Sequence, residues 1–425
     1  MKVALINTSD SGGGAAEACM RLLKALQQNN VDVTMLVQNK KRAEERVHST
    51  NKTAIDKARA NFNFLYERLP FIALHERDKT VRFAFSTATA GTDISKEQVI
   101  KEADIIHLHW TNSGFLSIDD LKKLVALNKP IVWTLHDMWA FTGGCHYSGP
   151  CNHFINQCGN CYYLRDPGDD DISHDGWLRK KDMLSKAKNI SFITCSNWLA
   201  GVALKSSLLD VENISAIPNP IDTGLFSPKD KTAARTKWGV NPLAKVILFG
   251  AANINDKRKG ISYLVQALHH LKNDYPQTAQ IEMVIFGKNK HFDTATLPFP
   301  VRQLSTITNS GDLAELYSLA DVFVSPSIQD NLPNMIMEAM ACGTPVAAFN
   351  TGGIPDLIDH GQNGFMAEFE SATDLAKGID ELLNSATANE LSAAARNKVL
   401  RDFNNDKVAG QYIQLYQSIL TPASV

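Results

Sequence analysis

Short apolar runs alternate along this chain with segments whose apolar residues recur at helical spacing. The first two runs, at residues 2–7 and 31–37, flank a helical pattern at 15–26 that follows a glycine-rich turn. Similar runs continue at residues 105–109, 131–135, 191–194, 246–249, 283–286, 322–325 and 346–349. Short buried runs that alternate with helices are typical of parallel sheets covered on both faces. The pattern predicts an α/β fold built from doubly wound sheets.

A proline-rich segment divides this pattern into two parts. Residues 217–222 read IPNPID, and the alternation of strands and helices begins again at residues 245–250. Such segments often mark domain boundaries, so we place the hinge within residues 216–227. The sequence predicts an N-terminal domain at 1–215 and a C-terminal domain at 216–403, two doubly wound domains that face each other across a cleft. Ligands of such sheets bind beyond the carboxyl ends of the strands.

Length and charge narrow the class of partner. A chain of 425 residues is long enough for two domains, and 43 Lys and Arg residues balance 45 Asp and Glu residues. A nucleic-acid-binding protein would show an excess of basic residues, so a small-molecule ligand is expected instead. The first residues do not resemble a signal peptide, and no apolar stretch approaches the roughly 18–20 residues that cross a bilayer. We therefore expect a soluble, cytoplasmic protein that does not bind nucleic acid.

The stretch SIQDNLPNMIMEAM, at residues 327–340, carries two acids around the start of an apolar helix. It follows the strand at 322–325, and the N–H groups of Leu332, Asn334 and Met335 at the helix start suit a phosphate or diphosphate. Glu338 lies within the helix among apolar neighbours, where ribose hydroxyls would satisfy its carboxylate. The structural alternative is that Glu338 pairs with a buried Lys or Arg and that Asp330 only caps the helix.

Several motifs together resemble retaining glycosyltransferases of family 4. They are SPSIQDNLPNMIMEAMACGTPVAAFNTGGIPDLI, the Gly12-Gly13-Gly14 turn, IIHLHW, TLHD, IPNPID, RKG and NGF, and they extend through most of the chain. The resemblance implies the GT-B fold, with a last helix at about 404–425 that returns to the N-terminal domain. It also implies an enzyme that transfers a sugar from a nucleotide-diphosphate sugar, with UDP favoured. The acceptor would be a glycan or a lipid-linked molecule, in surface polysaccharide synthesis.

The same resemblance assigns roles to residues around the helix start. Glu338 would hold the ribose, Asp330 would contact the donor sugar, and the diphosphate would lie against Asn331, Leu332 and Asn334. The glycine turn, through Gly13 and Gly14, would carry part of the diphosphate charge. The family usually has Glu where this chain has the shorter Asp330.

Basic residues that could stabilise the diphosphate occur in the segment NINDKRKG, just after the strand at 246–249. The resemblance assigns the phosphate-binding lysine to Lys259. The family's arginine partner normally lies about six residues earlier, where this chain has Asn253, so Arg258 is the candidate substitute. The alternative is that Arg258 points to solvent.

His136 follows the strand at 131–135, and the resemblance places a histidine here beside the transferred sugar. Without this resemblance, a lone histidine after a strand is more often a packed residue or a capping residue. In the preceding motif HLHW, His109 lies nearer the carboxyl end of its strand than His107, which we interpret as structural. The resemblance favours a front-face reaction in which the leaving phosphate accepts the acceptor's proton, with Asp137 as the rival nucleophile.

Two other function classes fit the same architecture. One is an enzyme that uses phosphate or rearranges the sugar, such as a phosphorylase or an epimerase. The other is a sugar-nucleotide-binding protein that has lost catalysis, which the departures at Asp330 and Asn253 would favour. His136, Lys259 and Glu338 are all present, which favours a transferase that needs no cofactor for catalysis.

The loop GGCHYSGPCNHFINQCGNCYYL concentrates four of the seven cysteines. Thiols at this spacing predict a structural zinc site, and the predicted ligands are Cys145, Cys151, Cys158 and Cys161. His146 or His153 is an alternative ligand, and free buried thiols or an adventitious disulfide are the alternatives to metal.

The segment at residues 58–79 mixes aromatic residues with Arg and Lys. It is a candidate for peripheral contact with the inner face of an anionic membrane, where a lipid-linked acceptor would lie. The alternative, and the commoner outcome for such a stripe, is a helix that packs its aromatic side against the N-terminal sheet.

Overall fold

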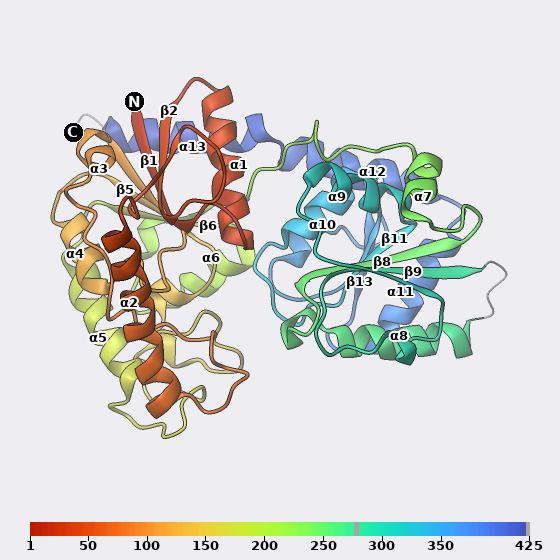
Figure 1. The fold of residues 1–425 in the computed structure, drawn as a ribbon, viewed down its shortest axis with the longest axis horizontal. Helices are drawn as coiled ribbons and strands as arrows, with labels where there is room; N and C mark the ends of the chain where they lie inside the picture. Colours follow the sequence, from red (N-terminus) through yellow and green to blue (C-terminus); the bar gives the residue numbers. More distant parts are fainter. Residues whose placement is uncertain (276–279, 422–425) are drawn as a thin grey trace. The chain divides into compact units, whose positions relative to one another are not determined.

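The computed structural model describes residues 1–275 and 280–421, which form two compact units (Figure 1). Unit 1 comprises Met1–Pro218 and the described part of Ala409–Val425, and unit 2 comprises Asn219–Val408. These boundaries lie a few residues after the expected ones at 215 and 403, and the C-terminal segment belongs to unit 1. Each unit contains one parallel sheet.

Unit 1 is built on a seven-stranded sheet in the order β3-β2-β1-β4-β5-β6-β7. Its strands are β1 (Lys2–Ser9), β2 (Asp32–Asn39), β3 (Val47–Ser49), β4 (Ile105–Leu108), β5 (Ile131–Leu135), β6 (Ile190–Thr194) and β7 (Ile214–Ala216). Its helices are α1 (Gly14–Gln28), α2 (Ala54–Pro70), α3 (Gln98–Glu102), α4 (Ile118–Val125), α5 (Ile172–Ser185), α6 (Asn197–Ala203) and α13 (Asn405–Leu420), most of which lies in unit 1.

Unit 2 is built on a six-stranded sheet in the order β10-β9-β8-β11-β12-β13. Its strands are β8 (Lys245–Asn253), β9 (Ile281–Lys288), β10 (Val301–Leu304), β11 (Val322–Ser325), β12 (Val346–Phe349) and β13 (Gly364–Ala367). Helices α8 (Ile261–Asp274) and α11 (Ala372–Asn384) cover one face (Figure 1). The other face carries α7 (Lys231–Trp238), α9 (Ser310–Leu319), α10 (Asn334–Ala341) and α12 (Ala388–Asp402).

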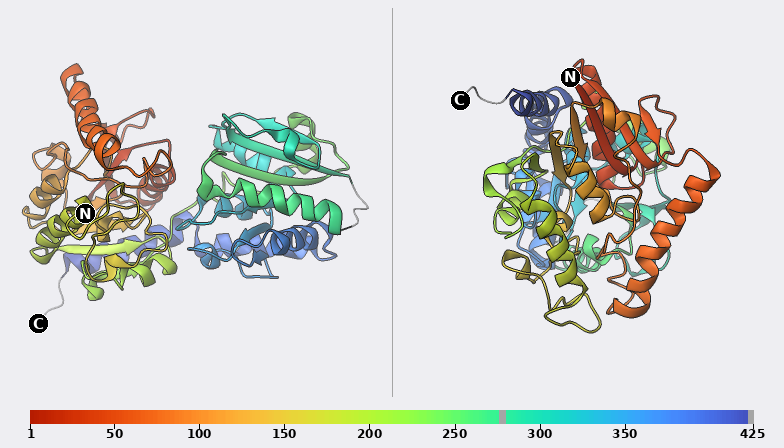
Figure 2. Two further views of the ribbon diagram at one scale, coloured as in Figure 1. Left: turned by 90° about the horizontal axis from the view of Figure 1, so that it is seen from below. Right: turned by 90° about the vertical axis from the view of Figure 1, so that its left-hand side faces the viewer.

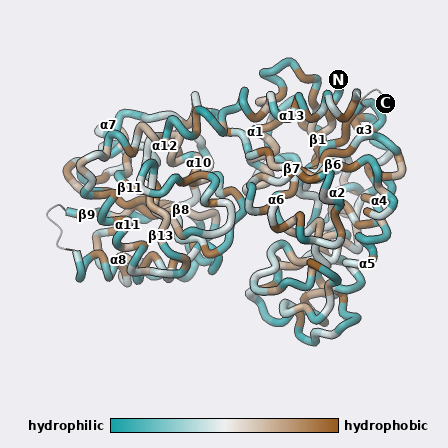
Figure 3. Tube along the Cα trace, turned by 180° about the vertical axis from the view of Figure 1, so that it is seen from behind, coloured by the Kyte–Doolittle hydropathy of each residue, from teal (hydrophilic) through white to brown (hydrophobic). Residues whose placement is uncertain are grey.

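Both sheets have the strand order of the doubly wound dinucleotide-binding fold, with the order reversing at the first strand of each unit. The inner strands form the apolar core, and hydrophobic residues concentrate along them (Figure 3). In unit 1, hydrogen bonds connect α13 to the sheet. Tyr416 Oη lies 2.7 Å from His107 Nδ1, and Tyr412 Oη lies 2.9 Å from Thr134 Oγ1. The structural interpretation of His107, which is fully buried, agrees with these bonds.

No helix in residues 1–275 or 280–421 is long and apolar enough to cross a membrane.

A buried lysine organises the loop that follows β5. Lys180 of α5 is 1% exposed, and its ammonium donates to the carbonyl oxygens of Trp139 and Thr142, the latter at 2.9 Å. The ammonium also lies 3.7 Å from the centroid of the Trp139 ring. Burial lowers the pKa of Lys180 to about 7. The loop beside His136 therefore depends on a lysine amino group held inside unit 1.

We expect the contribution of Lys180 to the free energy of unfolding to rise between about pH 7 and pH 10. The folded-state pKa lies below that of the unfolded chain, so folding releases a proton in this range, and higher pH favours the folded state by up to about 1.4 kcal/mol per pH unit. Lys180→Met removes this slope. It also costs about 1–3 kcal/mol for the two carbonyl oxygens left without a donor.

Urea unfolding of the wild type and of Lys180→Met, followed by tryptophan fluorescence at several pH values, measures this difference. Five of the six tryptophans lie in unit 1, so the signal reports mainly that unit. Lys181→Met, a change at an exposed neighbour on the same helix, is the control and should alter stability little. The expectation would be contradicted if the difference in free energy of unfolding between the wild type and Lys180→Met became smaller as the pH rises.

Candidate active site

The predicted donor turn of unit 2 lies between β11 and α10. Helix α10 begins after Pro333, which has no side-chain oxygen to cap the helix. This N-cap residue therefore does not supply the acceptor that Ser, Thr, Asp or Asn supplies at many helix starts. Asn331 and Leu332 are buried in the turn, and Asn334 Oδ1 lies 3.3 Å from Asn219 Nδ2. The turn is thus a folded part of unit 2, and its N-cap residue offers no side-chain acceptor.

Two residues that the resemblance assigns to the donor site meet at this turn. Lys259 lies in a short 3-10 turn (Lys257–Lys259) after β8, and its Nζ is 2.5 Å from Asp330 Oδ2. The side chains are 27% and 16% exposed, so the ion pair is partly shielded from water. Asp330 does not cap α10, whose N-cap residue is Pro333. A ligand that binds Lys259 must therefore compete with this carboxylate.

Glu338 is 6% exposed on α10, and a buried tyrosine is one of its hydrogen-bond partners. Tyr317 of α9 is fully buried and donates its hydroxyl to Glu338 Oε2 at 2.7 Å. Three aromatic rings pack against the Tyr317 ring, with centroid distances of 5.6–6.4 Å: Phe226, Phe286 and Phe323. The hydrogen bond from Tyr317 thus fixes the position of one carboxylate oxygen of Glu338. A phenol hydroxyl supplies a hydrogen bond but no charge.

The second basic candidate is placed less favourably than Lys259. Arg258 is 46% exposed at its side chain and donates to Asp256 Oδ2 at 2.7 Å. Asn253, which replaces the family's arginine, ends β8 and is exposed. The backbone at Arg258 has a clearer structural role, because its carbonyl oxygen accepts from Ile328 N at 2.9 Å and joins the two turns.

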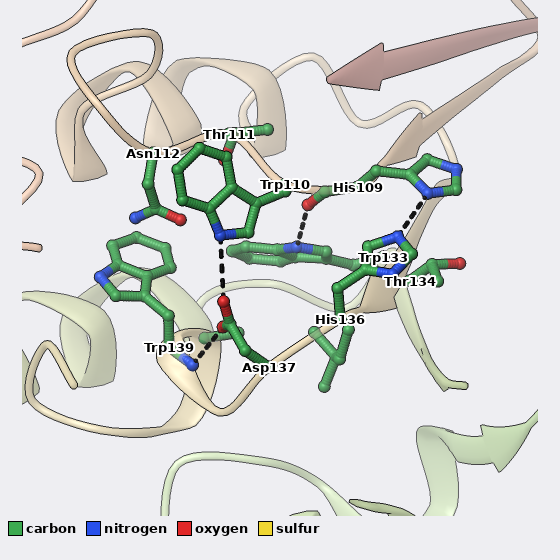
Figure 4. A pocket seen from close by; sticks show the side chains of 11 residues that line it. His109, Trp110, Thr111, Asn112, Trp133, Thr134, His136, Asp137 and Trp139 are labelled. Atoms are coloured by element: carbon green, nitrogen blue, oxygen red, sulfur yellow. Dashed lines mark hydrogen bonds between the residues drawn. The ribbon is translucent and has the colours of Figure 1, made fainter. Parts of the chain in front are cut away.

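In unit 1, His136 is part of a bonded chain that follows β4, β5 and β6. Its Nε2 lies 2.9 Å from His109 Nδ1 (Figure 4), and its Nδ1 lies 3.5 Å from Cys195 Sγ. Burial lowers the pKa of His136 to about 4 and that of His109 well below its usual value, so both rings are neutral at pH 7. Both ring nitrogens of His136 have partners inside unit 1. Its predicted contact with the donor sugar stays a prediction.

Asp137, the rival nucleophile, is fully engaged in hydrogen bonds. Its Oδ2 accepts from Trp110 Nε1 at 3.0 Å and lies 2.7 Å from His146 Nδ1, while Oδ1 accepts from Trp139 N at 2.8 Å (Figure 4). Although burial alone would raise the pKa of Asp137, the neighbouring His146 and these hydrogen bonds lower it overall. The carboxylate organises the walls of a small pocket between Trp110 and Trp139 (Figure 4). This bonding leaves it poorly placed for nucleophilic attack.

The glycine turn of unit 1 lies at the start of α1. Gly12 has φ of 91°, which favours glycine, and Gly13 is the N-cap residue, without a side chain to cap the helix. A Cβ atom at Gly12 or Gly13 would meet nothing within 4 Å. Packing within the structure does not explain the glycine at 13, and an uncapped helix start suits an anion. Gly14 is the first residue of the helix.

The described residues give the predicted zinc site no support, since they contain no group of three or more His, Cys, Asp or Glu side chains that could hold a metal ion. Cys145 and Cys161 pack in a small apolar cluster with Phe85, whereas Cys158 packs in the main core of unit 1. Burial raises the pKa of Cys158 to about 11 and of Cys161 to about 12, so both thiols stay protonated. Cys151 is half-buried. The zinc site therefore stays a prediction without structural support among the described residues.

The two histidines considered as substitute ligands have other partners. His146 lies between Asp137 and Ser86 Oγ, the latter 2.9 Å from Nε2, and His153 Nδ1 lies 2.7 Å from the carbonyl oxygen of Gly159.

The sequence did not indicate Tyr317, Cys195 or the bonding role of His109. Tyr317 occupies a buried position of an ordinary apolar helix, where a tyrosine does not stand out. Cys195 is a single cysteine after β6, and its bond to His136 depends on the pairing of β5 with β6. The one available signal was that His109, His136 and Cys195 each follow a predicted strand.

Comparison with known proteins agrees with this architecture. Residues 12–225 match the family model described as Glycosyltransferase Family 4, and residues 244–385 match Glycosyl transferases group 1. Among curated proteins, N-acetyl-alpha-D-glucosaminyl L-malate synthase of Bacillus anthracis is 26% identical over 220 residues, which cover 49% of this chain. The aligned segment spans 55% of that relative's length.

Solved structures show the same fold. A glycosyltransferase from Rickettsia africae ESF-5 has a TM-score of 0.65 at 16% identity and covers 99% of both chains. Anabaena HepE in complex with UDP and glucose has a TM-score of 0.62 at 16% identity, covering 98% of this chain and all of that one. The fold is therefore GT-B.

Because the model at residues 12–225 matches half of the 425 residues, and the remaining unit matches a glycosyltransferase model of its own, this chain belongs to glycosyltransferase family 4.

Proposed function

We propose that this enzyme transfers a sugar from UDP-sugar to a hydroxyl group of a glycan or lipid-linked acceptor, with retention of configuration, in surface polysaccharide synthesis. The observation that carries the proposal is the meeting of Lys259 and Asp330 beside the start of α10, one turn before Glu338. UDP is favoured because HepE, which shares the fold, was solved with UDP and glucose. The activity would take place in the cytoplasm, at the inner face of the membrane.

The proposed site would exchange one ion pair for another. The diphosphate would take the Lys259 ammonium from Asp330, since two phosphate groups carry more charge than one carboxylate. Asp330 would then be available to accept hydrogen bonds from the hydroxyl groups of the donor sugar. The positive end of the α10 helix dipole would supply further stabilisation as negative charge builds on the leaving group.

Glu338 would hold the ribose through its carboxylate, which the hydrogen bond from Tyr317 orients. The leaving phosphate would accept the proton of the attacking hydroxyl, because the bonds to Asp137 make that carboxylate a poor nucleophile. Family membership favours this transferase over the phosphorylase, the epimerase and the protein without catalysis.

A panel of UDP, GDP and ADP tests the choice of nucleotide. We expect UDP at about 100 times its dissociation constant to stabilise unit 2 by roughly 2.7 kcal/mol and to raise its melting temperature. GDP and ADP should produce smaller shifts at the same concentration. A larger shift with either purine nucleotide would overturn the choice of UDP, and no shift with any of the three would count against the nucleotide site.

Separate substitutions of the two acids should have different effects. Glu338→Gln should weaken UDP binding by about 1–3 kcal/mol, since it removes a charged acceptor. Asp330→Asn should leave UDP binding unchanged or tighten it, because Lys259 loses the carboxylate that competes with the diphosphate, while hydrolysis of the donor falls. Calorimetry with UDP and steady-state hydrolysis of the best UDP-sugar measure both effects. Equal losses of UDP affinity in the two variants would contradict this division of roles.

Tyr317→Phe should weaken UDP binding about fivefold to tenfold, the effect of one lost hydrogen bond to Glu338. The loss should disappear when Glu338 is already Gln, because the two residues act through one contact. Tyr412→Phe is a matched control. It removes the hydroxyl of another buried tyrosine, in unit 1, and should leave UDP affinity unchanged. Equal UDP affinity in Tyr317→Phe and the wild type would show that the tyrosine only packs.

A further inference from the structure

Exposed apolar side chains concentrate in one part of unit 1. Eight of the 17 large exposed hydrophobic side chains among the described residues fall within residues 55–83, on α2 and the segment after it. They are Ile55, Phe62, Phe64, Leu65, Tyr66, Leu69, Leu74 and Phe83, here called the α2 surface. Phe62 is 63% exposed and Phe83 is 66% exposed. Isolated exposed apolar residues are common, but a group of this size marks an interaction site.

Helix α2 has its apolar side turned away from the protein. Ile55, Phe62, Tyr66 and Leu69 recur at helical spacing along one side, and the rings of Phe62 and Tyr66 stack at 5.8 Å. The helix lies at the margin of unit 1 in both views of Figure 2. The alternative that this stripe packs against the sheet is therefore wrong.

The inner side of α2 is polar and is held by hydrogen bonds. Asn63 Nδ2 donates to the carbonyl oxygen of Gly91 at 2.8 Å, and Glu67 Oε2 accepts from Gly114 N at 2.8 Å. Arg68 donates to the carbonyl oxygen of Phe85 at 2.6 Å. A surface helix of a soluble protein normally has the opposite arrangement, with apolar residues inward. These bonds fix the orientation, so the apolar side cannot turn inward without breaking them.

The charges around the α2 surface are mostly positive. The exposed basic residues in this part of the chain are Lys52, Lys57, Arg59, Arg77 and Lys79. The exposed acid is Asp78, which pairs with Arg77, and Lys52 pairs with Glu97 at 2.7 Å. The half-buried Asp56 accepts the N-cap bonds of Thr53, so Lys57, Arg59 and Lys79 carry most of the positive charge. An apolar side rich in aromatic residues, with a basic border, is the pattern of helices that lie in the interface of an anionic bilayer.

We infer that the α2 surface binds the surface of a bilayer that contains anionic lipids. The aromatic and aliphatic side chains of α2 enter the boundary between head groups and acyl chains, and the basic residues face lipid phosphates. A second copy of this chain fits less well, because a two-fold contact through α2 would bring two basic borders together with few acids to pair them. This inference stands on α2 alone and does not depend on the donor or the acceptor.

Flotation with vesicles tests the inference. We expect the wild type to float with phosphatidylcholine vesicles that contain about one third phosphatidylglycerol, and to float much less with pure phosphatidylcholine. Binding should fall as the salt concentration rises. The triple variant Phe62→Ser, Tyr66→Ser, Leu69→Ser should lose vesicle binding about tenfold or more, since three apolar side chains no longer enter the interface.

The matched control is a triple variant in unit 2, Leu225→Ser, Leu243→Ser, Phe369→Ser, which also replaces three exposed apolar residues. It should float like the wild type. Both variants change exposed positions, and their melting temperatures should confirm that they fold. Wild type that stays with the soluble fraction, or equal flotation of the two triple variants, would overturn the inference. Light scattering that shows a dimer without lipid, lost only in the α2 variant, would favour a second copy instead.

Discussion

Parallel pairing of the strands is the constraint on which the rest of this structure depends. In each sheet the strands run in one direction, so all their carboxyl ends lie at the same edge. Side chains that are far apart in sequence therefore meet in the turns beyond that edge. In unit 1 this brings His109, His136 and Cys195 into one bonded chain. In unit 2 it brings Lys259, after β8, to Asp330, after β11, because those two strands are neighbours.

Close approach of backbone atoms then fixes the turn that carries Asp330. Gly260 has φ of 69°, and a Cβ atom there would lie 1.8 Å from the carbonyl oxygen of Pro326. Gly352 has φ of 57°, and its Cβ would lie 1.9 Å from the carbonyl oxygen of Asp330 itself. Any larger residue at either position would push the turn away. The position of the Asp330 carboxylate is thus set by two glycines, one in the turn after β8 and one in the turn after β12.

The inner strands were predictable because burial on both faces makes their residues continuously apolar. The four strands that were not predicted, β3, β7, β10 and β13, are the edges of the two sheets. Edge strands here are short, and β3, β7 and β10 are only partly buried, so no apolar run marks them. The position of His136 was predictable because this residue directly follows a predicted strand. Lys259, which lies in a turn beyond the end of β8, was placed by the family resemblance instead. The bond from Tyr317 to Glu338 was not, because it depends on how α9 packs against α10.

The inverted orientation of α2 has a cause within unit 1. Arg68 donates to Ser86 Oγ at 3.1 Å, Ser86 Oγ lies 2.9 Å from His146 Nε2, and His146 Nδ1 lies 2.7 Å from Asp137. The polar side of the helix is thus the first member of a hydrogen-bonded series that ends beside His136. If α2 turned its apolar side inward, this series would lose the donor at its first position, and buried polar groups would be left without partners. The same bonds that position the turn after β5 therefore hold the aromatic side of α2 toward the outside.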